Sequence, residues 1–152
     1  MDEEDLILEG VKNSLEAGAS IIEVSIDGNS FSIVDDGEMS RIPDFRACSS
    51  SKGGKRGRGL FLISEVSRGR CSITRESGRT VLRATFDRAL EAERIIPICF
   101  NLTQALVFHS LRDGRERYLL DSEVLSKMDV DPMKAIDLAR LKRIIREKEQ
   151  RS

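Results

Sequence analysis

The chain has 152 residues, of which 34% are charged, but its 25 basic and 26 acidic side chains leave a net charge of only −1. This balance gives the chain no overall field that would attract nucleic acid or an anionic membrane, and the length suits one domain with a small appendage. The three cysteines are widely spaced and include no Cys-x-x-Cys pair. We therefore expect neither a disulfide framework nor a zinc or iron–sulfur site.

The first segment predicts a helix over residues 3–15. Its apolar residues Leu8, Val11 and Leu15 recur at helical spacing, and Gly18 follows as a C-cap. An apolar stripe of this kind indicates a helix that packs one face on a core.

The same helix carries a second stripe that is separate from the apolar one. Glu9, Asn13 and Ala17 lie four residues apart and therefore stack on one side. An asparagine amide oxygen is a competent ligand for a hard cation such as Mg²⁺, and a carboxylate one turn earlier could hold a water beside that ion. By itself the pattern is more often a solvated helix face than a site.

Two β-hairpins are expected in the first 88 residues. Apolar residues alternate over residues 22–35 around a Gly28–Asn29 turn, and again over residues 71–87 around Ser77–Gly78. The first hairpin ends on Asp-Asp-Gly at residues 35–37, where an Asp could accept a hydrogen bond from a purine amine and a glycine would let the backbone approach the ring.

Residues 49–60 read SSSKGGKRGRGL and could be a linker, an RNA tether of the RGG kind or a phosphate-binding loop. Gly57 and Gly59 directly precede a helix that is expected to begin near Leu60 and end at Gly69, which would place free backbone N–H groups at a helix N-terminus. The stretch is not a Walker A loop, since no Gly-Lys-Ser or Gly-Lys-Thr has the required spacing. A tether is disfavoured because the stretch is not repetitive and no aromatic residues interleave with it.

After Arg88 the expected elements are a short helix with Pro97 in its first turn, a hairpin with its turn at residues 112–114, and a long closing helix. For the last, Asp131 is the expected N-cap and Pro132 the first helical residue. The predicted apolar side of this helix consists of Met133, Ile136, Leu138, Leu141, Ile144 and Ile145.

The order of these elements predicts an α+β fold with a mixed or antiparallel sheet. We expect residues 1–88 to form the main domain and residues 89–152 to form a C-terminal extension of a short helix, a hairpin and a long helix.

Four stretches together resemble the GHKL superfamily of Bergerat-fold ATPases, which includes mismatch-repair ATPases and the catalytic domains of histidine kinases. They are EGVKNSLEAGASIIEVSID, DDGEM, SSSKGGKRGRGL and SGRTVLRATF. The resemblance implies a Bergerat-type α/β sandwich with its helices on one face of the sheet. In size and in its C-terminal extension the chain is similar to small stand-alone histidine-kinase-like ATPases.

The resemblance also implies a site for ATP and Mg²⁺. Glu9 would be the general base, Asn13 the metal ligand and Asp35 the contact to the adenine amine. The implied nucleotide-binding residues are Asn13, Ala17, Asp35, Gly37, Met39, Ser51, Lys52, Gly57, Gly59, Leu60 and Thr80.

The expected function is that of an ATP- and Mg²⁺-binding regulatory or accessory protein with slow hydrolysis. Two alternatives stay open: a serine-protein kinase of the anti-sigma type, in which Glu9 would activate a protein hydroxyl, and an interaction module without nucleotide, because Glu38 stands where the family usually has a second glycine. His109, the only histidine, lies in an expected strand, so it is a packed or edge residue rather than a phosphoacceptor.

The remaining expectations concern location and partners. The start of the chain has no basic region followed by an apolar run, and no apolar stretch reaches the length of a membrane helix, which predicts a cytoplasmic protein. A protein partner or self-association through residues 89–152 is expected, because the apolar side of the last helix is too large to leave in water; no nucleic-acid or membrane partner is expected.

Overall fold

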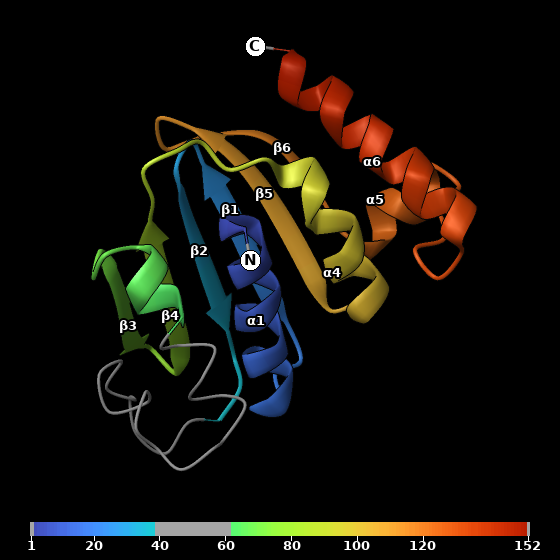
Figure 1. Cartoon of the computed structure of the whole chain (residues 1–152). Coiled ribbons are helices and arrows are strands. Elements are labelled where there is room, and N and C mark those ends of the chain that lie inside the picture. The colour runs from blue at the N-terminus through green and yellow to red at the C-terminus, as the bar shows by residue number, and fades with distance from the viewer. Residues whose placement is uncertain (1, 39–61, 152) are drawn as a thin grey trace.

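The computed structural model describes residues 2–38 and 62–151, which form a six-stranded sheet in the order β3-β4-β2-β1-β5-β6 with helices packed on it (Figure 1). The strands are β1 (Ile22–Asp27), β2 (Ser30–Asp35), β3 (Cys71–Glu76), β4 (Arg79–Thr85), β5 (Leu106–Arg112) and β6 (Arg115–Leu120).

Consecutive strands form the three hairpins that the sequence predicts. In the β3–β4 turn both Ser77 (φ 52°) and Gly78 (φ 78°) have positive φ, as a type I′ turn requires, and the β5–β6 turn at Asp113–Gly114 has the same signature. These turns match the right-handed twist of the strands that they join, so each hairpin is specified locally.

One contact within the sheet is parallel and joins distant parts of the chain. β1 pairs with β5 from Ile22 opposite Leu106 to Asp27 opposite Leu111. The predicted extension of residues 89–152 therefore contributes two strands to the same sheet as the predicted main domain. The division between them stays a prediction, although one hydrophobic core spans both parts.

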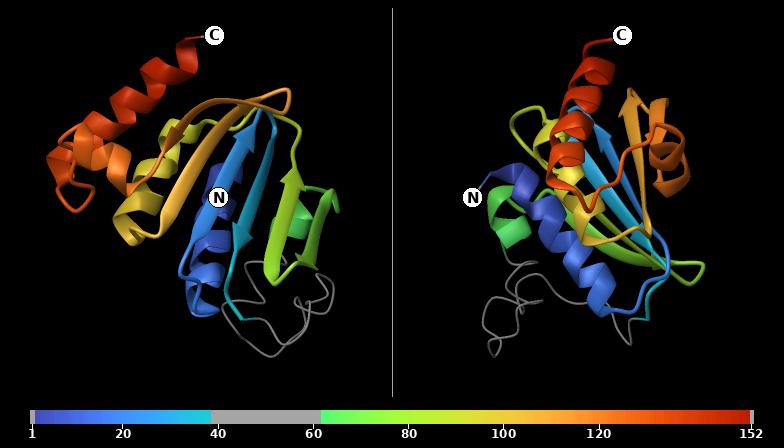
Figure 2. Two further views of the ribbon diagram at one scale, coloured as in Figure 1. Left: turned by 180° about the vertical axis from the view of Figure 1, so that it is seen from behind. Right: turned by 90° about the vertical axis from the view of Figure 1, so that its right-hand side faces the viewer.

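Helices cover one face of this sheet, as predicted. The helices are α1 (Glu3–Glu16), a helical segment at residues 62–66, the 3-10 turn η1 (Ala92–Arg94), α4 (Ile96–Leu102), α5 (Ser122–Lys127) and α6 (Ala135–Gln150). Figure 2 shows α1, the segment 62–66 and α4 on the same side of the sheet, while α5 lies beside the β6 edge. α6 packs mainly on η1 and α4, and its C-terminal end is joined to the sheet where Glu149 accepts hydrogen bonds from Ser110 of β5 and Tyr118 of β6.

The length of α1 follows from its sequence. Three acidic residues in its first turn interact favourably with the positive N-terminal end of the helix dipole. Gly18 (φ 77°) ends the helix in a Schellman motif, in which Ala19 N–H donates to the Ser14 carbonyl at 3.1 Å. Its buried residues Leu6, Ile7 and Val11 pack on the core face of the sheet.

The closing segment differs from its prediction in two respects. A separate short helix, α5, precedes it and is capped by the Asp121 carboxylate, which accepts a hydrogen bond from Val124 N–H at 2.9 Å. α6 begins at Ala135 instead of Pro132, because the Asp131 side chain accepts from Met133 N–H and so stabilises a turn ahead of the helix.

The predicted apolar side of α6 is only partly buried. Leu141 and Ile145 are fully buried, and Leu138 and Ile144 are half-buried, whereas Met133 and Ile136 are 61% and 74% exposed. Within the described residues, no helix is long and apolar enough to span a bilayer.

Candidate functional site

The candidate site lies where the C-terminal half of α1 meets the end of β2. Glu9, Asn13 and Ala17 are partly buried along one side of α1, and Asp35 is the last residue of β2. The chain after Asp35 returns to α1, because Glu38 N–H donates to the Ala17 carbonyl at 2.9 Å.

Asp35 is a carboxylate held in a buried position. Its side chain accepts a hydrogen bond from the Ser14 hydroxyl at 2.7 Å through Oδ2 and another from Gly37 N–H at 2.8 Å through Oδ1. The residue is 7% exposed. Since a carboxylate offers about four acceptor positions and two are used here, Asp35 keeps the capacity to accept from a ligand donor.

Gly37 sits where the backbone comes closest to α1. A Cβ added at this position would lie 2.8 Å from the Ala17 Cβ, 2.9 Å from the Ala17 carbonyl oxygen and 3.0 Å from Asp35 Oδ1. A side chain cannot fit there without displacing the helix or the carboxylate. Glycine is therefore required by space, because it lets the chain after β2 lie directly against α1.

Arg75 of β3 connects the same region to β4. Its Nη1 donates to the Gly37 carbonyl at 3.0 Å and to the Thr80 hydroxyl at 2.7 Å. Thr80 is 4% exposed and lies directly opposite Asp35 in the β2–β4 register. The guanidinium thus fixes Thr80 and the backbone of Gly37 beside the Asp35 carboxylate.

Asn13 carries the one buried side-chain nitrogen or oxygen atom that lacks a hydrogen-bond partner in the described parts of the chain. The atom is Nδ2, and it is one residue from Ser14, which holds Asp35. A buried amide without a partner costs free energy comparable to a lost hydrogen bond. A 180° flip of the side-chain amide exchanges its nitrogen and oxygen. The NH₂ group can donate to a phosphate oxygen, and the amide oxygen can bind a cation.

The neighbouring Asp36 has a different task. Its carboxylate accepts hydrogen bonds from the Ser20 hydroxyl and from the backbone N–H groups of Ser20 and Ile21, at 2.7 and 3.1 Å for the last two. The Ser20 hydroxyl bond, followed by the Ile21 amide bond, lowers the pKa of Asp36 to about 2. Asp36 therefore fastens the start of β1 to the end of β2, while Asp35 points to α1.

Of the predicted site residues, the structure gathers Ala17, Asp35, Gly37 and Thr80 through these contacts, with Asn13 on the adjoining turn of α1. Glu9 lies one helical turn before Asn13. The predicted residues outside the described part of the chain are Met39, Ser51, Lys52, Gly57, Gly59 and Leu60.

Sequence reasoning missed Ser14 and Arg75. A signal existed for each: Ser14 is a polar residue inside a helix, three positions after the buried Val11, and Arg75 alternates with Cys71 and Ile73 on the core-facing side of β3. A polar or charged residue whose place in the helix or strand pattern turns it toward the core needs a hydrogen-bond partner. Here Ser14 has Asp35 as its partner, and Arg75 has Gly37 and Thr80.

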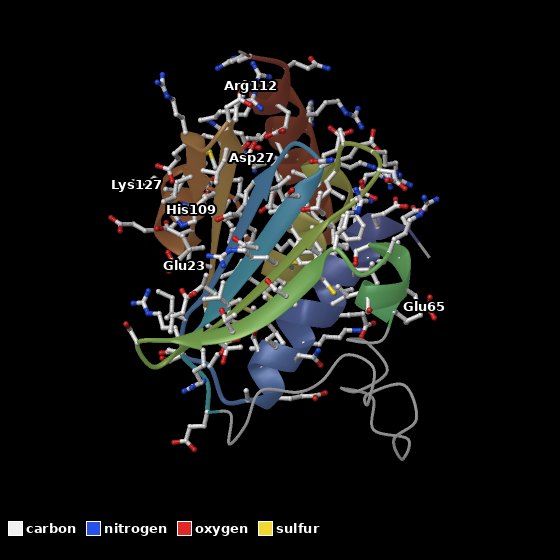
Figure 3. The ribbon with its side chains drawn as sticks, turned by 90° about the vertical axis from the view of Figure 1, so that its left-hand side faces the viewer. Glu23, Asp27, Glu65, His109, Arg112 and Lys127 are labelled. Atoms are coloured by element: carbon white, nitrogen blue, oxygen red, sulfur yellow. The ribbon has the colours of Figure 1, made fainter. Side chains whose placement is uncertain are left out.

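His109 lies on the other side of the sheet, away from α1 (Figure 3). Its ring nitrogens contact Glu116 at 2.5 Å and Glu23 at 3.2 Å. Burial lowers the pKa of His109, but the hydrogen bonds with Glu116 and Glu23 outweigh it, so the pKa is raised above 6.5. In the described ranges, no three or more His, Cys, Asp or Glu side chains are grouped as a metal centre would need.

Comparisons with known proteins add one finding. The sequence matches no family model and no curated protein. Among solved structures, the chain is similar to the Aquifex aeolicus MutL ATPase domain complexed with ADP, with a TM-score of 0.52 and 18% identity over 92% of this chain and 70% of that chain. At this identity the likeness shows the fold alone, an α+β sandwich with a mixed six-stranded sheet.

Proposed function

We propose that the chain binds ATP with Mg²⁺ between α1 and the end of β2 and acts as a nucleotide-dependent regulatory or accessory protein. The observation that carries this proposal is the buried, unpartnered amide of Asn13 next to the cluster of Ser14, Asp35 and Gly37. The GHKL-type fold supports it, because the similar MutL ATPase domain was solved with ADP.

The adenine end of the site is formed by the cluster at β2. Asp35 would accept a hydrogen bond from the exocyclic amine through a free acceptor position, and Thr80 beside it offers a hydroxyl. Gly37 lets the chain after Asp35 pack closely on Ala17, so that its backbone N–H can hold the Asp35 carboxylate. These groups are already held by Ser14 and Arg75, so binding requires little reorganisation.

The metal end of the site is formed by α1. Asn13 would hold Mg²⁺ through its amide oxygen, which fits a metal that typically takes one or two protein ligands and keeps several waters. When bound, Mg²⁺ supplies positive charge to the phosphate oxygens. Glu9, one turn earlier on α1, would orient a nearby water and accept its proton at a carboxylate oxygen.

A regulatory role also requires a contact with a protein. We assign this contact to residues 89–152, because α4, the turn before α6 and the first turn of α6 display exposed large apolar residues, namely Ile98, Leu102, Met133 and Ile136.

Thermal unfolding with and without Mg-ATP tests the proposal. ATP at about one hundred times its dissociation constant should add about 2.7 kcal/mol, which raises the midpoint of a domain of this size by roughly 5–10 °C. Asn13→Ala should lose the part of the shift that depends on Mg²⁺, which EDTA also removes from the unmodified chain. If millimolar Mg-ATP leaves the midpoint unchanged, the chain is an interaction module without nucleotide and the proposal is wrong.

A further inference from the structure

Three polar side chains form a row across the strands at the candidate site. Asp35 of β2 lies directly opposite Thr80 of β4, and Thr80 lies directly opposite Arg75 of β3. Side chains at directly opposite positions share one face of a sheet, with Cβ atoms about 5 Å apart. This polar row therefore places a carboxylate, a hydroxyl and a guanidinium next to one another on the face where Ser14 of α1 contacts Asp35.

The guanidinium of Arg75 is held by three acceptors. Its Nη1 donates to the Gly37 carbonyl at 3.0 Å and to the Thr80 hydroxyl oxygen at 2.7 Å, and its Nη2 donates to the Gly78 carbonyl at 3.2 Å. These acceptors belong to the chain after β2, to β4 and to the β3–β4 turn. Because the guanidinium is planar and rigid, three acceptors on different segments set its orientation.

The contact with Arg75 decides how the Thr80 hydroxyl can bond to a ligand. A hydroxyl has one hydrogen and two acceptor positions, and Arg75 occupies an acceptor position. The positive charge of the guanidinium also turns the hydroxyl hydrogen away from Arg75. Among the residues that the structure describes, none accepts this hydrogen, although Thr80 is only 4% exposed. Thr80 therefore keeps a donor for a ligand, beside the acceptor positions that Asp35 keeps.

An acceptor next to a donor matches one edge of adenine. The 6-amine of adenine donates and the adjacent ring nitrogen N1 accepts, whereas guanine has a carbonyl oxygen and an N–H group at the same two places. Asp35 suits the amine and Thr80 suits N1, either directly or through one bridging water. In the same pose, guanine would place an acceptor against the Asp35 carboxylate and a donor against the Thr80 hydroxyl hydrogen.

We propose that Arg75 is a positioning residue that sets the base specificity of this site, because it holds the Thr80 hydroxyl as a donor toward N1 while Asp35 accepts from the 6-amine. The inference rests on the proposed binding of ATP and assigns selectivity within that site. Arg75 acts through Thr80 and does not contact the base. Without Arg75 the hydroxyl could rotate and accept as well as donate, so N1 would lose a donor of defined direction.

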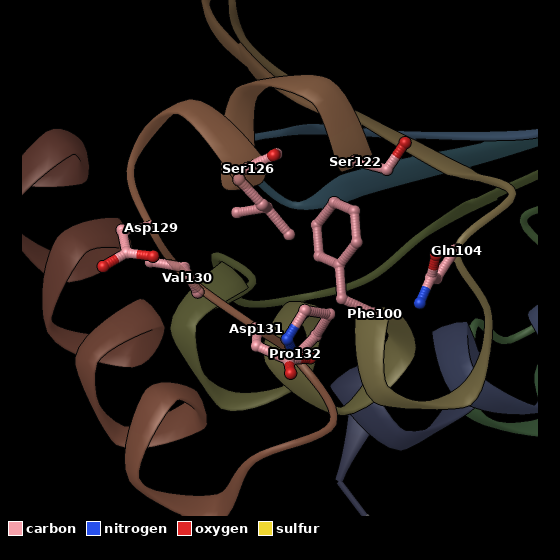
Figure 4. Close-up of a pocket in the computed structure, with 9 residues that line it drawn as sticks. Phe100, Gln104, Ser122, Ser126, Asp129, Val130, Asp131 and Pro132 are labelled. Atoms are coloured by element: carbon pink, nitrogen blue, oxygen red, sulfur yellow. The ribbon is translucent and has the colours of Figure 1, made fainter.

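A pocket elsewhere in the molecule offers a different place for a ring. It has a volume of about 280 Å³ and lies between α4, α5 and residues 129–132 (Figure 4). Its lining residues include Asp129 and Asp131 and no basic side chain, so a triphosphate would meet negative charge there. The polar row contributes no residue to this lining, so a base bound in this pocket would not respond to changes at Arg75 or Thr80.

Calorimetric titration with Mg-ATP and with 1-deaza-ATP, in which a C–H group replaces N1, tests the proposal. The unmodified chain should bind ATP about 5- to 15-fold more tightly, because the analogue leaves a buried donor without an acceptor. Thr80→Val and Arg75→Met should each reduce this ratio to below about twofold. Arg79→Met is the matched control and should leave the ratio unchanged, because Arg79 is the next residue of β4, faces the other side of the sheet and pairs with Glu23 at 3.5 Å.

The ratio separates positioning from a purely structural role. If Arg75 only stabilised the fold, Arg75→Met would weaken the binding of both nucleotides by the same factor and leave their ratio unchanged. Because Arg75 acts through Thr80, adding Arg75→Met to Thr80→Val should not change the ratio further. Circular dichroism and thermal melts establish that each variant is folded. Arg75→Lys, which keeps the charge without the planar fork, takes the place of an Arg75→Met chain that does not fold and should lower the ratio at least about twofold.

The outcomes distinguish this inference from the proposed function. An unmodified chain that binds neither nucleotide would overturn both. If the unmodified chain binds ATP, then equal affinity for ATP and 1-deaza-ATP, or an unchanged ratio in the folded Arg75 variant, would overturn the role of Arg75 alone.

Discussion

Replacing Asp35 by Asn separates its structural contacts from its proposed contact with adenine. The Asn carbonyl can still accept from Gly37 N–H, and the new amide group can donate to the Ser14 hydroxyl oxygen. The Ser14 hydroxyl can then donate to the Gly10 carbonyl, which is already 3.2 Å away. Every buried polar group keeps a partner, so the free energy of unfolding should fall by no more than about 1 kcal/mol.

Ligand binding should respond much more strongly to Asp35→Asn. Loss of the charged acceptor should cost about 1–3 kcal/mol of binding free energy, which corresponds to roughly 5- to 150-fold weaker ATP binding. Titration calorimetry of both proteins with Mg-ATP measures this difference. Asp36→Asn is the matched control, since it removes the same charge one residue away, where the carboxylate contacts Ser20 and Ile21 instead of α1. Equal ATP affinity for the unmodified chain and Asp35→Asn would refute the adenine assignment.

Three further outcomes are expected. Glu9→Gln should leave Mg-ATP binding nearly intact and lower phosphate release by about two to four orders of magnitude, as loss of a general base does; hydrolysis at the unmodified rate would contradict that role. Gly37→Ala should lower the free energy of unfolding by about 1–3 kcal/mol in urea titrations, because its Cβ would meet the Ala17 Cβ at 2.8 Å. An unchanged free energy of unfolding would show that α1 shifts to accommodate the methyl group. Because the pKa of His109 is raised, its stabilisation is complete below its unfolded pKa of about 6.5 and is lost as pH rises through the higher folded pKa. His109→Gln should therefore flatten the dependence of unfolding free energy on pH above about pH 6.5 in urea titrations. Identical profiles for both proteins would be evidence against the pairing with Glu116.

The elements that the sequence predicts well are those with local causes. Positive φ at Gly28, Gly78 and Gly114 marks the hairpin turns, and the residues there are types that favour such turns. Glu9, Asn13 and Ala17 share one side of α1 by helical spacing alone, so their grouping needed no knowledge of the rest of the fold.

The parts that sequence reasoning missed have causes that are distant or weak. α5 has six residues and buries only Leu125, so its periodic signal is too short to detect, although Asp121 is a recognisable N-cap. The start of α6 was misplaced because Asp131 and Pro132 are equally suited to a turn and to a helix start. The link from Ser14 to Asp35 spans 21 positions and depends on how α1 packs on β2, which no local pattern encodes.

The parallel pairing of β1 with β5 makes folding depend on nearly the whole chain. β1 and β2 can form their hairpin as soon as residue 35 is available, but the other edge of β1 waits for residues 106–111, more than 70 positions later. Closing such a long loop is slow, and until it closes an apolar strand offers unpaired backbone groups to any neighbouring chain. Synthesis or refolding therefore passes through a stage at which β1 is an open edge, and β5 acts as the chain's own protection against intermolecular strand pairing.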